Sequence, residues 1–278
     1  MNLWQEAFAR AVDALAPRDS AEITRFWNLF ITGRAAGEGA WFWLQSFRRL
    51  YILHLLVLSG SQVEALMRLG RGLYTGLEGC AGLGGAARTR ACCLRLGLSA
   101  LVLAFAAATG WSAPITRAAL LGVGGLWLLR WGPLSLAALV FVLQWSLFAF
   151  QREELGFYLS WIAYLVVLLM QELRCSRAGS TLLVSSLLYG ILEVWHFENP
   201  FQIRAFCVCL AANLIFGVLF ERVLMPLAAF YIMAALLGAL SFVTLGSMPL
   251  EAGGDFLALW SVPSTKALLV VLKWLMYT

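Results

Sequence analysis

The sequence contains few charged residues, because Asp, Glu, Lys and Arg together make up 13% of its 278 residues. In a soluble domain about a quarter of the residues are charged, and about half are apolar. Here 62% of the residues are hydrophobic, and the mean hydropathy is +0.82. The composition therefore excludes an ordinary soluble domain and indicates a membrane protein. The net charge of +5 is not gathered in a basic domain or tail, so we interpret it as membrane topology signal.

Histidine is scarce, since the chain has only His54 and His196. A zinc site on a helix needs two closely spaced histidines and a further ligand. Glu193, His196 and Glu198 form an E-x-x-H-x-E group, which is short of ligands for an intramembrane metalloprotease. The six cysteines include no CxxC pair with a matching partner pair, and we expect them to act as small apolar residues. We predict neither a metal nor a cofactor.

Two further catalytic patterns are also missing. Ser59-Gly60 with His54 has the wrong order and spacing for a rhomboid-type serine protease. The glycine-rich stretch 82–85 lacks the GK[ST] ending that cradles nucleotide phosphates. We therefore predict that the protein is not an enzyme.

Long apolar runs without alternation dominate the rest of the chain. Barrel strands alternate every second residue, so these runs favour a helix bundle. We predict an all-α, polytopic membrane helix bundle with eight or nine spans, multi-pass in the inner (cytoplasmic) membrane. The last span is interrupted by Pro263 and Lys266. The predicted spans are 50–67, 96–109, 115–129, 133–150, 155–170, 180–195, 204–220, 223–245 and 256–277.

Residues 1–48 have a different pattern, with apolar side chains at helical spacing on one face only. Trp41, Phe42 and Trp43 follow, close to Arg48-Arg49, and such aromatic and basic neighbours are typical of the membrane interface. We predict an N-terminal amphipathic segment of helices lying on the bilayer, followed by a membrane domain over 49–278. The alternative is a pair of amphipathic helices that pack on the end of the bundle.

The first predicted span carries polar residues that a simple membrane anchor does not need, and a broken or re-entrant helix is the interpretation we favour. After it, we predict a flexible, arginine-rich loop over 68–95. Polar groups within membrane spans cost free energy and suggest function, although Ser, Gln and Asn also bond helices together. The candidates across all spans are His54, Ser59, Gln62, Glu64, Arg117, Gln144, Ser146, Glu193 and Asn213.

Five short elements occur in order between residues 29 and 230. They are Leu29–Arg34 (LFITGR), His54–Val63 (HLLVLSGSQV), Thr109–Ser112 with Arg117-Ala118, Pro133–Leu136 with Gln144–Ser146, and Ala212–Leu214 with Pro226-Leu227. In this order they resemble the signature elements of the ComEC-type competence proteins, whose second element reads HLLAISGLHV.

The resemblance implies a membrane channel that imports single-stranded DNA during natural transformation. It implies contact with the lipid bilayer. It leaves open whether the chain is a stand-alone channel core, an oligomer, or a subunit that works with separate competence subunits such as a DNA receptor, a nuclease and a helicase. A polyanion needs a watery path lined by polar and basic groups. By resemblance, the residues that line or shape this path are His54, Ser59, Gly60, Gln62, Arg117, Gln144, Ser146 and Asn213.

The chain also departs from the family pattern. Gln62 replaces the family's second histidine, and Val142-Leu143 replace a glycine and a phenylalanine. The chain has no stretch for an oligonucleotide-binding fold or a metallo-β-lactamase-like domain, and no HxHxDH cluster, so we expect no nuclease activity. Two alternatives remain open: a non-transporting membrane scaffold, and a diverged transporter for another substrate.

Overall fold

A computed structural model describes residues 3–15, 21–32, 38–49, 60–80, 86–128, 130–191 and 202–245, and the single positions 263, 265, 266 and 270. All regular structure in these ranges is helical, and none of it is strand. The prediction of an all-α chain is therefore confirmed.

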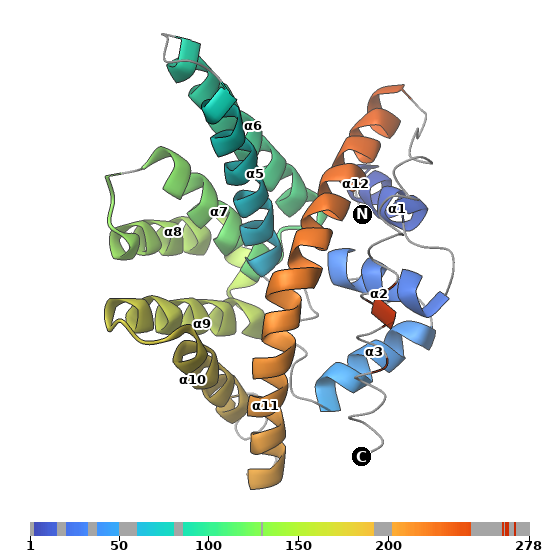
Figure 1. The fold of residues 1–278 in the computed structure, drawn as a ribbon, viewed down its shortest axis with the longest axis vertical. Helices are drawn as coiled ribbons and strands as arrows, with labels where there is room; N and C mark the ends of the chain where they lie inside the picture. The colour runs from blue at the N-terminus through green and yellow to red at the C-terminus, as the bar shows by residue number, and fades with distance from the viewer. Residues whose placement is uncertain are drawn as a thin grey trace.

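One long helix runs through the middle of the molecule (Figure 1). It consists of α11 (Ile203–Leu219), the π-helical segment η3 (Phe220–Leu224) and α12 (Met225–Leu245). The apolar stretch Ile203–Thr244 has 42 residues. At about 1.5 Å per residue it is about 63 Å long, roughly twice the thickness of a bilayer's hydrocarbon core. The prediction of two separate spans at 204–220 and 223–245 is therefore wrong.

The junction of the two predicted spans is a change of helix type rather than a break. Glu221 and Arg222 stay within the helix, because charged side chains at the helix surface do not interrupt its backbone hydrogen bonds. Pro226 lacks the N–H that an α-helix needs, and its ring crowds the preceding turn. Just before it, the N–H of Met225 donates to the carbonyl of Phe220, five residues back. This wider turn makes room for the proline within a continuous helix.

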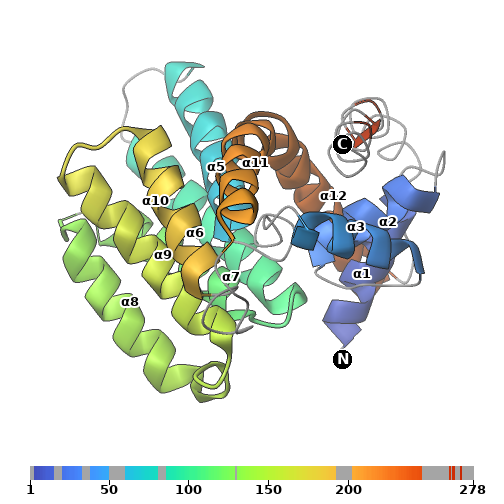
Figure 2. The ribbon, with the colours of Figure 1, turned by 90° about the horizontal axis from the view of Figure 1, so that it is seen from below.

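The three N-terminal helices are α1 (Leu3–Leu15), α2 (Ala21–Thr32) and α3 (Glu38–Arg49). They lie on one side of the long helix, and the helices of residues 60–189 lie on the other (Figures 1 and 2). The apolar faces of the N-terminal helices enter the protein core, where the Trp27 ring stacks on Tyr231 with centroids 4.7 Å apart. Trp43, predicted for the membrane interface, is instead fully buried and donates to the Glu22 carbonyl at 3.0 Å. A bilayer-surface position for residues 1–48 stays a prediction.

The predicted arginine-rich loop over 68–95 is wrong, because most of it is helical. Helices α5 (Gly60–Cys80) and α6 (Ala86–Ala108) extend together at one end of the molecule. Arginine, leucine and alanine are strong helix formers, and they outweigh the glycines that suggested a flexible linker. Residues 50–59 of the first predicted span, and the glycine-rich stretch 82–85, lie outside the described residues.

Four further helices match predicted spans closely. They are α7 (Ala113–Trp127), α8 (Pro133–Leu147), α9 (Leu155–Glu172) and α10 (Arg177–Tyr189). Proline in the first turn helps α7 and α8 to begin, because the missing N–H has no partner there anyway. The Ser176 hydroxyl begins α10 by accepting the Gly179 N–H at 3.1 Å.

The gap between the predicted spans 96–109 and 115–129 is a tight turn between α6 and α7. Gly110 has φ of 77° and Trp111 has φ of 57°, so two successive residues are left-handed. Glycine adopts this conformation without cost, whereas for Trp111 it is uncommon. The turn places the start of α7 beside the end of α6.

Three helical stretches in the described part of the chain are long and apolar enough to cross a bilayer: Ala91–Ala108, Leu155–Glu172 and Ile203–Thr244. Large apolar side chains are also exposed on the outer faces of several helices. Examples are Leu134 and Leu147 on α8, Leu169 on α9, Ile215 on α11 and Leu237 on α12, each more than half exposed. Such surfaces are typical of contact with lipid, and they indicate a membrane protein. The larger number of spans and the multi-pass topology stay predictions.

Candidate functional site

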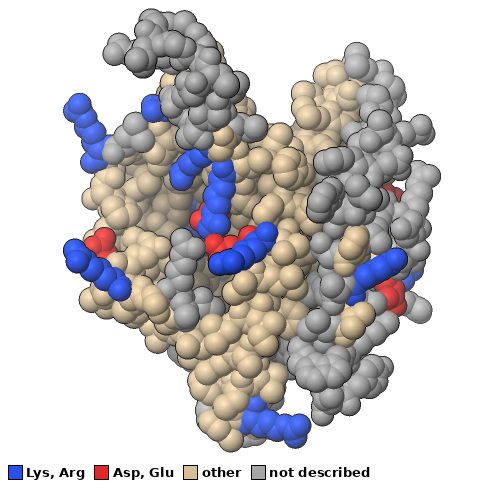
Figure 3. All heavy atoms as spheres, viewed as in Figure 1, with Lys and Arg blue, Asp and Glu red and all other residues tan. Residues whose placement is uncertain are grey.

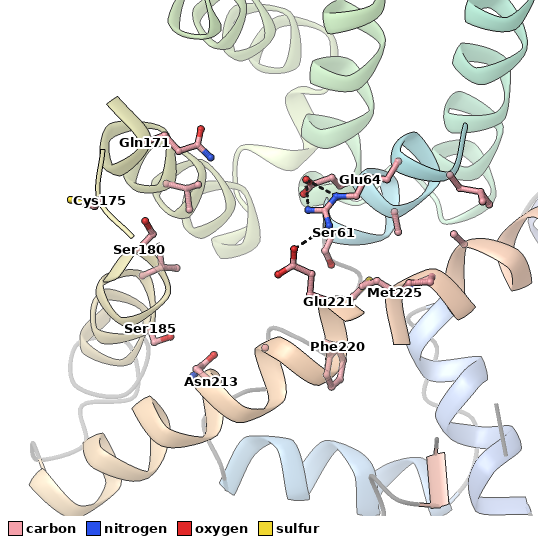
Figure 4. A pocket seen from close by; sticks show the side chains of 18 of the residues that line it. Ser61, Glu64, Gln171, Cys175, Ser180, Ser185, Asn213, Phe220, Glu221 and Met225 are labelled. Atoms are coloured by element: carbon pink, nitrogen blue, oxygen red, sulfur yellow. Dashed lines mark hydrogen bonds and ion pairs between the residues drawn. The ribbon is translucent and has the colours of Figure 1, made fainter. Parts of the chain in front are cut away.

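A pocket of about 600 Å³ lies between α5, α9, α10 and the long helix (Figure 4). Its wall combines apolar side chains with charged and hydrogen-bonding ones. The lining residues with polar or thiol side chains are Ser61, Glu64, Arg68, Gln171, Cys175, Ser180, Ser185, Asn213 and Glu221. A pocket of this size can hold a small organic molecule.

Arg68 is the centre of an ion-pair cluster at this pocket. Its Nη2 and Nε donate to Glu64 Oε1 at 2.8 and 3.2 Å, one helical turn away. Its Nη1 donates to Glu221 Oε1 on η3 at 3.1 Å. Figure 3 shows arginine and carboxylate side chains meeting in the middle of a largely uncharged face.

The charge of the pocket wall follows from its lining. Among the residues that the structure describes, its charged members are Glu64, Arg68 and Glu221, and Glu221 has a further interaction besides the one with Arg68. No group of three or more His, Cys, Asp or Glu side chains that could hold a metal is found among the described residues. The arrangement combines hydrogen-bonding groups with an ion-pair cluster.

Two of the polar candidates named from the sequence, Glu64 and Asn213, line this pocket directly. Asn213 lies on α11. Its Nδ2 donates to the Cys209 carbonyl at 2.9 Å, one turn earlier on α11. That bond holds the amide in a fixed orientation, and Figure 4 shows the side chain pointing toward α10.

The structure brings two other predicted residues together, Gly60 and Arg117. A Cβ placed on Gly60 would lie 3.0 Å from Ala118 Cβ and 3.1 Å from Arg117 Nη2, so α5 begins in close contact with α7. Arg117 Nη1 also donates to the Ser160 carbonyl on α9, and its guanidinium lies 5.0 Å from the centre of the Tyr164 ring. Arg117 therefore joins three helices, and the described residues give it no carboxylate partner.

Gln144 belongs to a buried hydrogen-bond network beneath α7. Its Nε2 donates to the Ala113 carbonyl at 2.9 Å and to Gln151 Oε1 at 2.7 Å. Its Oε1 accepts the Trp161 Nε1–H at 3.0 Å, and Gln151 in turn donates to Thr116 Oγ1 at 3.0 Å. These contacts hold α7, α8 and α9 together, which is the helix-bonding role left open by the sequence.

The remaining predicted residues lie elsewhere. Gln62 is fully buried and donates from Nε2 to the Phe30 carbonyl on α2, away from the pocket wall. Ser146 is exposed on the outer side of α8. It lies two positions from the buried Gln144, on the opposite face of the helix. The other predicted positions lie outside the described residues: His54, Ser59, Glu193, His196 and Glu198.

The sequence patterns do not predict Arg68, Glu221 and Gln171 as pocket residues. The glycine and arginine content around Arg68 predicts a loop, although its spacing of four from Glu64 is typical of an ion pair on a helix. Glu221 was interpreted as an interruption between spans, and no local pattern links it to a residue 153 positions earlier.

The chain was compared with protein-family models, with curated proteins and with solved structures, and none of the three comparisons finds a match.

Proposed function

We propose that the chain is the membrane core of a transport system and that the pocket between α5, α9, α10 and the long helix forms part of the substrate path. One observation carries the proposal: a charged, hydrogen-bonding pocket lies among helices whose outer faces are apolar. Charged groups inside a membrane protein are costly and commonly mark a substrate path. A bilayer anchor or a passive helix bundle has no need of such a pocket.

For the substrate we propose single-stranded DNA, imported across the inner membrane in a multi-pass topology. Support comes from the five ordered elements that resemble the ComEC-type competence proteins, one of which contributes Asn213 to the pocket wall. Separate subunits, namely a DNA receptor, a nuclease and a helicase, would supply the soluble steps.

A second candidate, a transporter for another substrate, is favoured by the charge of the pocket. Its described charged members include two carboxylates, and carboxylates repel a phosphate chain and attract a cation. The third candidate is a non-transporting membrane scaffold. A scaffold does not need an open pocket for its function.

Filling the pocket tests the transport proposal. A Cβ on Gly217 meets no atom within 4 Å, and this residue lines the pocket, so Gly217→Phe places a ring there without an initial clash. Gly97 on α6 has equally open surroundings but does not line the pocket, which makes Gly97→Phe the matched control. The measurement is the transformation frequency of a naturally transformable host that depends on this gene.

We expect Gly217→Phe to lower transformation by at least about tenfold, because the ring would occupy space on the proposed substrate path. Gly97→Phe should leave it unchanged, with both variants present in the membrane at wild-type level. If deletion of the gene leaves DNA uptake intact, the DNA proposal fails. If deletion abolishes uptake but Gly217→Phe has no effect, the scaffold is the better description.

A further inference from the structure

We infer that a surface formed by α5, α6 and the α7–α8 turn binds the headgroups of anionic phospholipids. Its positive charges are Arg71 on α5, Arg95 on α6 and Arg130 in the turn, and we call it the arginine surface. This inference does not depend on DNA being the transported substrate. It rests on the packing of these elements, on the charge of the segment and on the apolar side chains beside the arginines.

The end of α7 lies against α6 close to Arg95. The Trp127 Nε1–H donates to Ser99 Oγ at 3.1 Å. Ser99 and Arg95 are four residues apart on α6, so they lie on the same face of that helix. Arg130 follows Trp127 by three residues, in the turn that leads to α8. The packing of α7 on α6 therefore brings Arg95 and Arg130 to the same part of the molecule.

Arg71 reaches this surface from α5. A Cβ placed on Gly70 would lie 2.5 Å from Leu98 Cδ1, so α5 and α6 pack closely at this level. Leu98 is the neighbour of Ser99, which accepts the hydrogen bond from α7. In Figure 1 the α5–α6 hairpin lies in the upper part of the view, whereas α11 begins at the bottom. The arginine surface is therefore well separated from the start of the long helix.

The sequence makes this part of the chain positive. Residues 71–132 contain a single carboxylate, Glu78, and no lysine, and their arginines are Arg71, Arg88, Arg90, Arg95, Arg117 and Arg130. Arg71 and Arg130 are exposed, and Arg95 is partly exposed. The ion pairs between described residues include none of these three. Their guanidinium groups are thus available to a phosphate, which accepts paired N–H bonds from arginine.

Large apolar side chains beside the arginines favour a lipid over a nucleic acid. Trp127 and Trp131, on either side of Arg130, are exposed, and so are Leu96 on α6 and Leu134 on α8. Tryptophan and arginine together are typical of headgroup depth, and arginines next to an apolar helix attract anionic lipids. The apolar stretch Ala91–Ala108 begins at this surface. A nucleic acid offers phosphates but no acyl chain for the leucines, whereas a phospholipid offers both.

Phosphatidylglycerol and phosphatidylcholine with identical acyl chains make a matched pair of probes, because their headgroups differ in net charge. Their binding to the full chain, purified in an uncharged detergent, can be measured by native mass spectrometry over a series of lipid concentrations. The test variant is Arg95→Gln/Arg130→Gln. The control variant Arg25→Gln/Arg204→Gln removes the same number of charges from α2 and from the start of α11, outside the arginine surface.

We expect the wild type and the control variant to bind phosphatidylglycerol at least about tenfold more tightly than phosphatidylcholine, since each arginine near a membrane surface contributes about fivefold. Arg95→Gln/Arg130→Gln should reduce this preference by at least about fivefold. Arg95→Lys/Arg130→Lys keeps the charge and should keep the preference, which separates loss of charge from misfolding.

Equal binding of the two lipids by the wild type overturns the inference. An equal loss of preference in the test and control variants overturns it too, because the charge then acts without a defined surface. If the wild type shows no lipid preference but binds a single-stranded oligonucleotide that Arg95→Gln/Arg130→Gln does not bind, the surface is a nucleic-acid site instead.

Discussion

Arg68 on α5 donates from Nη1 to Glu221 Oε1 at 3.1 Å, joining residues 153 positions apart. Glu221 lies in η3, the segment where the long helix changes from α to π geometry. The ion pair therefore connects the α5–α6 hairpin to the middle of the longest helix, at the wall of the pocket. A local distortion of the backbone and the main charged contact of the site occur at the same place.

The Arg68–Glu221 pair should contribute little to stability, because both side chains are about half exposed. In a double-mutant cycle with Arg68→Gln and Glu221→Gln, we expect a coupling free energy of about 0.2–1 kcal/mol. Thermal unfolding in detergent measures it, and raised salt should reduce it. A coupling of zero at low salt would show that the two side chains do not meet.

Replacing Gln144 should destabilise the protein strongly. Gln144→Leu removes the hydrogen bonds to Ala113, Gln151 and Trp161 and leaves buried polar groups without partners. We expect a loss of about 1–3 kcal/mol in the free energy of unfolding.

Ser146→Ala is the matched control for Gln144→Leu, because the two residues lie two positions apart on opposite faces of α8. Ser146 is exposed, and we expect a change within about 0.5 kcal/mol. Equal effects of the two substitutions would contradict the orientation of α8.

Two glycines of α5 should respond oppositely to alanine. At Gly60 a Cβ would lie 3.0 Å from Ala118 Cβ and 3.3 Å from the Pro114 carbonyl oxygen, so Gly60→Ala forces α5 away from α7. We expect a destabilisation of about 1–3 kcal/mol. A Cβ on Gly72 would meet no atom within 4 Å outside its own helix backbone, and Gly72→Ala should stabilise the helix by about 0.5–1 kcal/mol. The unfolding temperatures of the two variants test both predictions. A stabilised Gly60→Ala protein would contradict the close contact between α5 and α7.

Trp27 tests whether the N-terminal helices pack on the bundle. It is fully buried, stacks on Tyr231 and donates from Nε1 to Thr265 Oγ1 at 3.1 Å. We expect Trp27→Ala to destabilise the protein by about 3–5 kcal/mol. Trp131 is 48% exposed, and Trp131→Ala should change stability by less than about 0.5 kcal/mol. If both substitutions are equally mild in unfolding experiments, α2 does not pack on α12 in the membrane.

Several elements of this fold could be predicted from sequence because their causes are local. Apolar runs bounded by Gly-Trp, Trp-Gly-Pro and Ser-Arg turns predicted α7 to α10 within a few residues. For residues 68–95 the glycine content predicts a loop, but the structure has the hairpin of α5 and α6. Helix propensity and packing outweigh the glycines there. The charges of Glu221 and Arg222 also predict a break between two spans. A local charge pattern does not reveal that both side chains lie on one continuous helix.

By itself, the sequence determined the membrane class, the helical fold and the polar residues that stand out within apolar segments. These follow from composition and from periodicity, which depend on neighbouring residues alone. The tertiary structure decided what each polar residue does. It placed Asn213 at the pocket, Gln144 in a buried network, Gln62 against α2 and Ser146 on the outside. It also joined Arg68 to Glu221, because a contact between distant positions depends on how helices pack, and helix packing leaves no local pattern in the sequence.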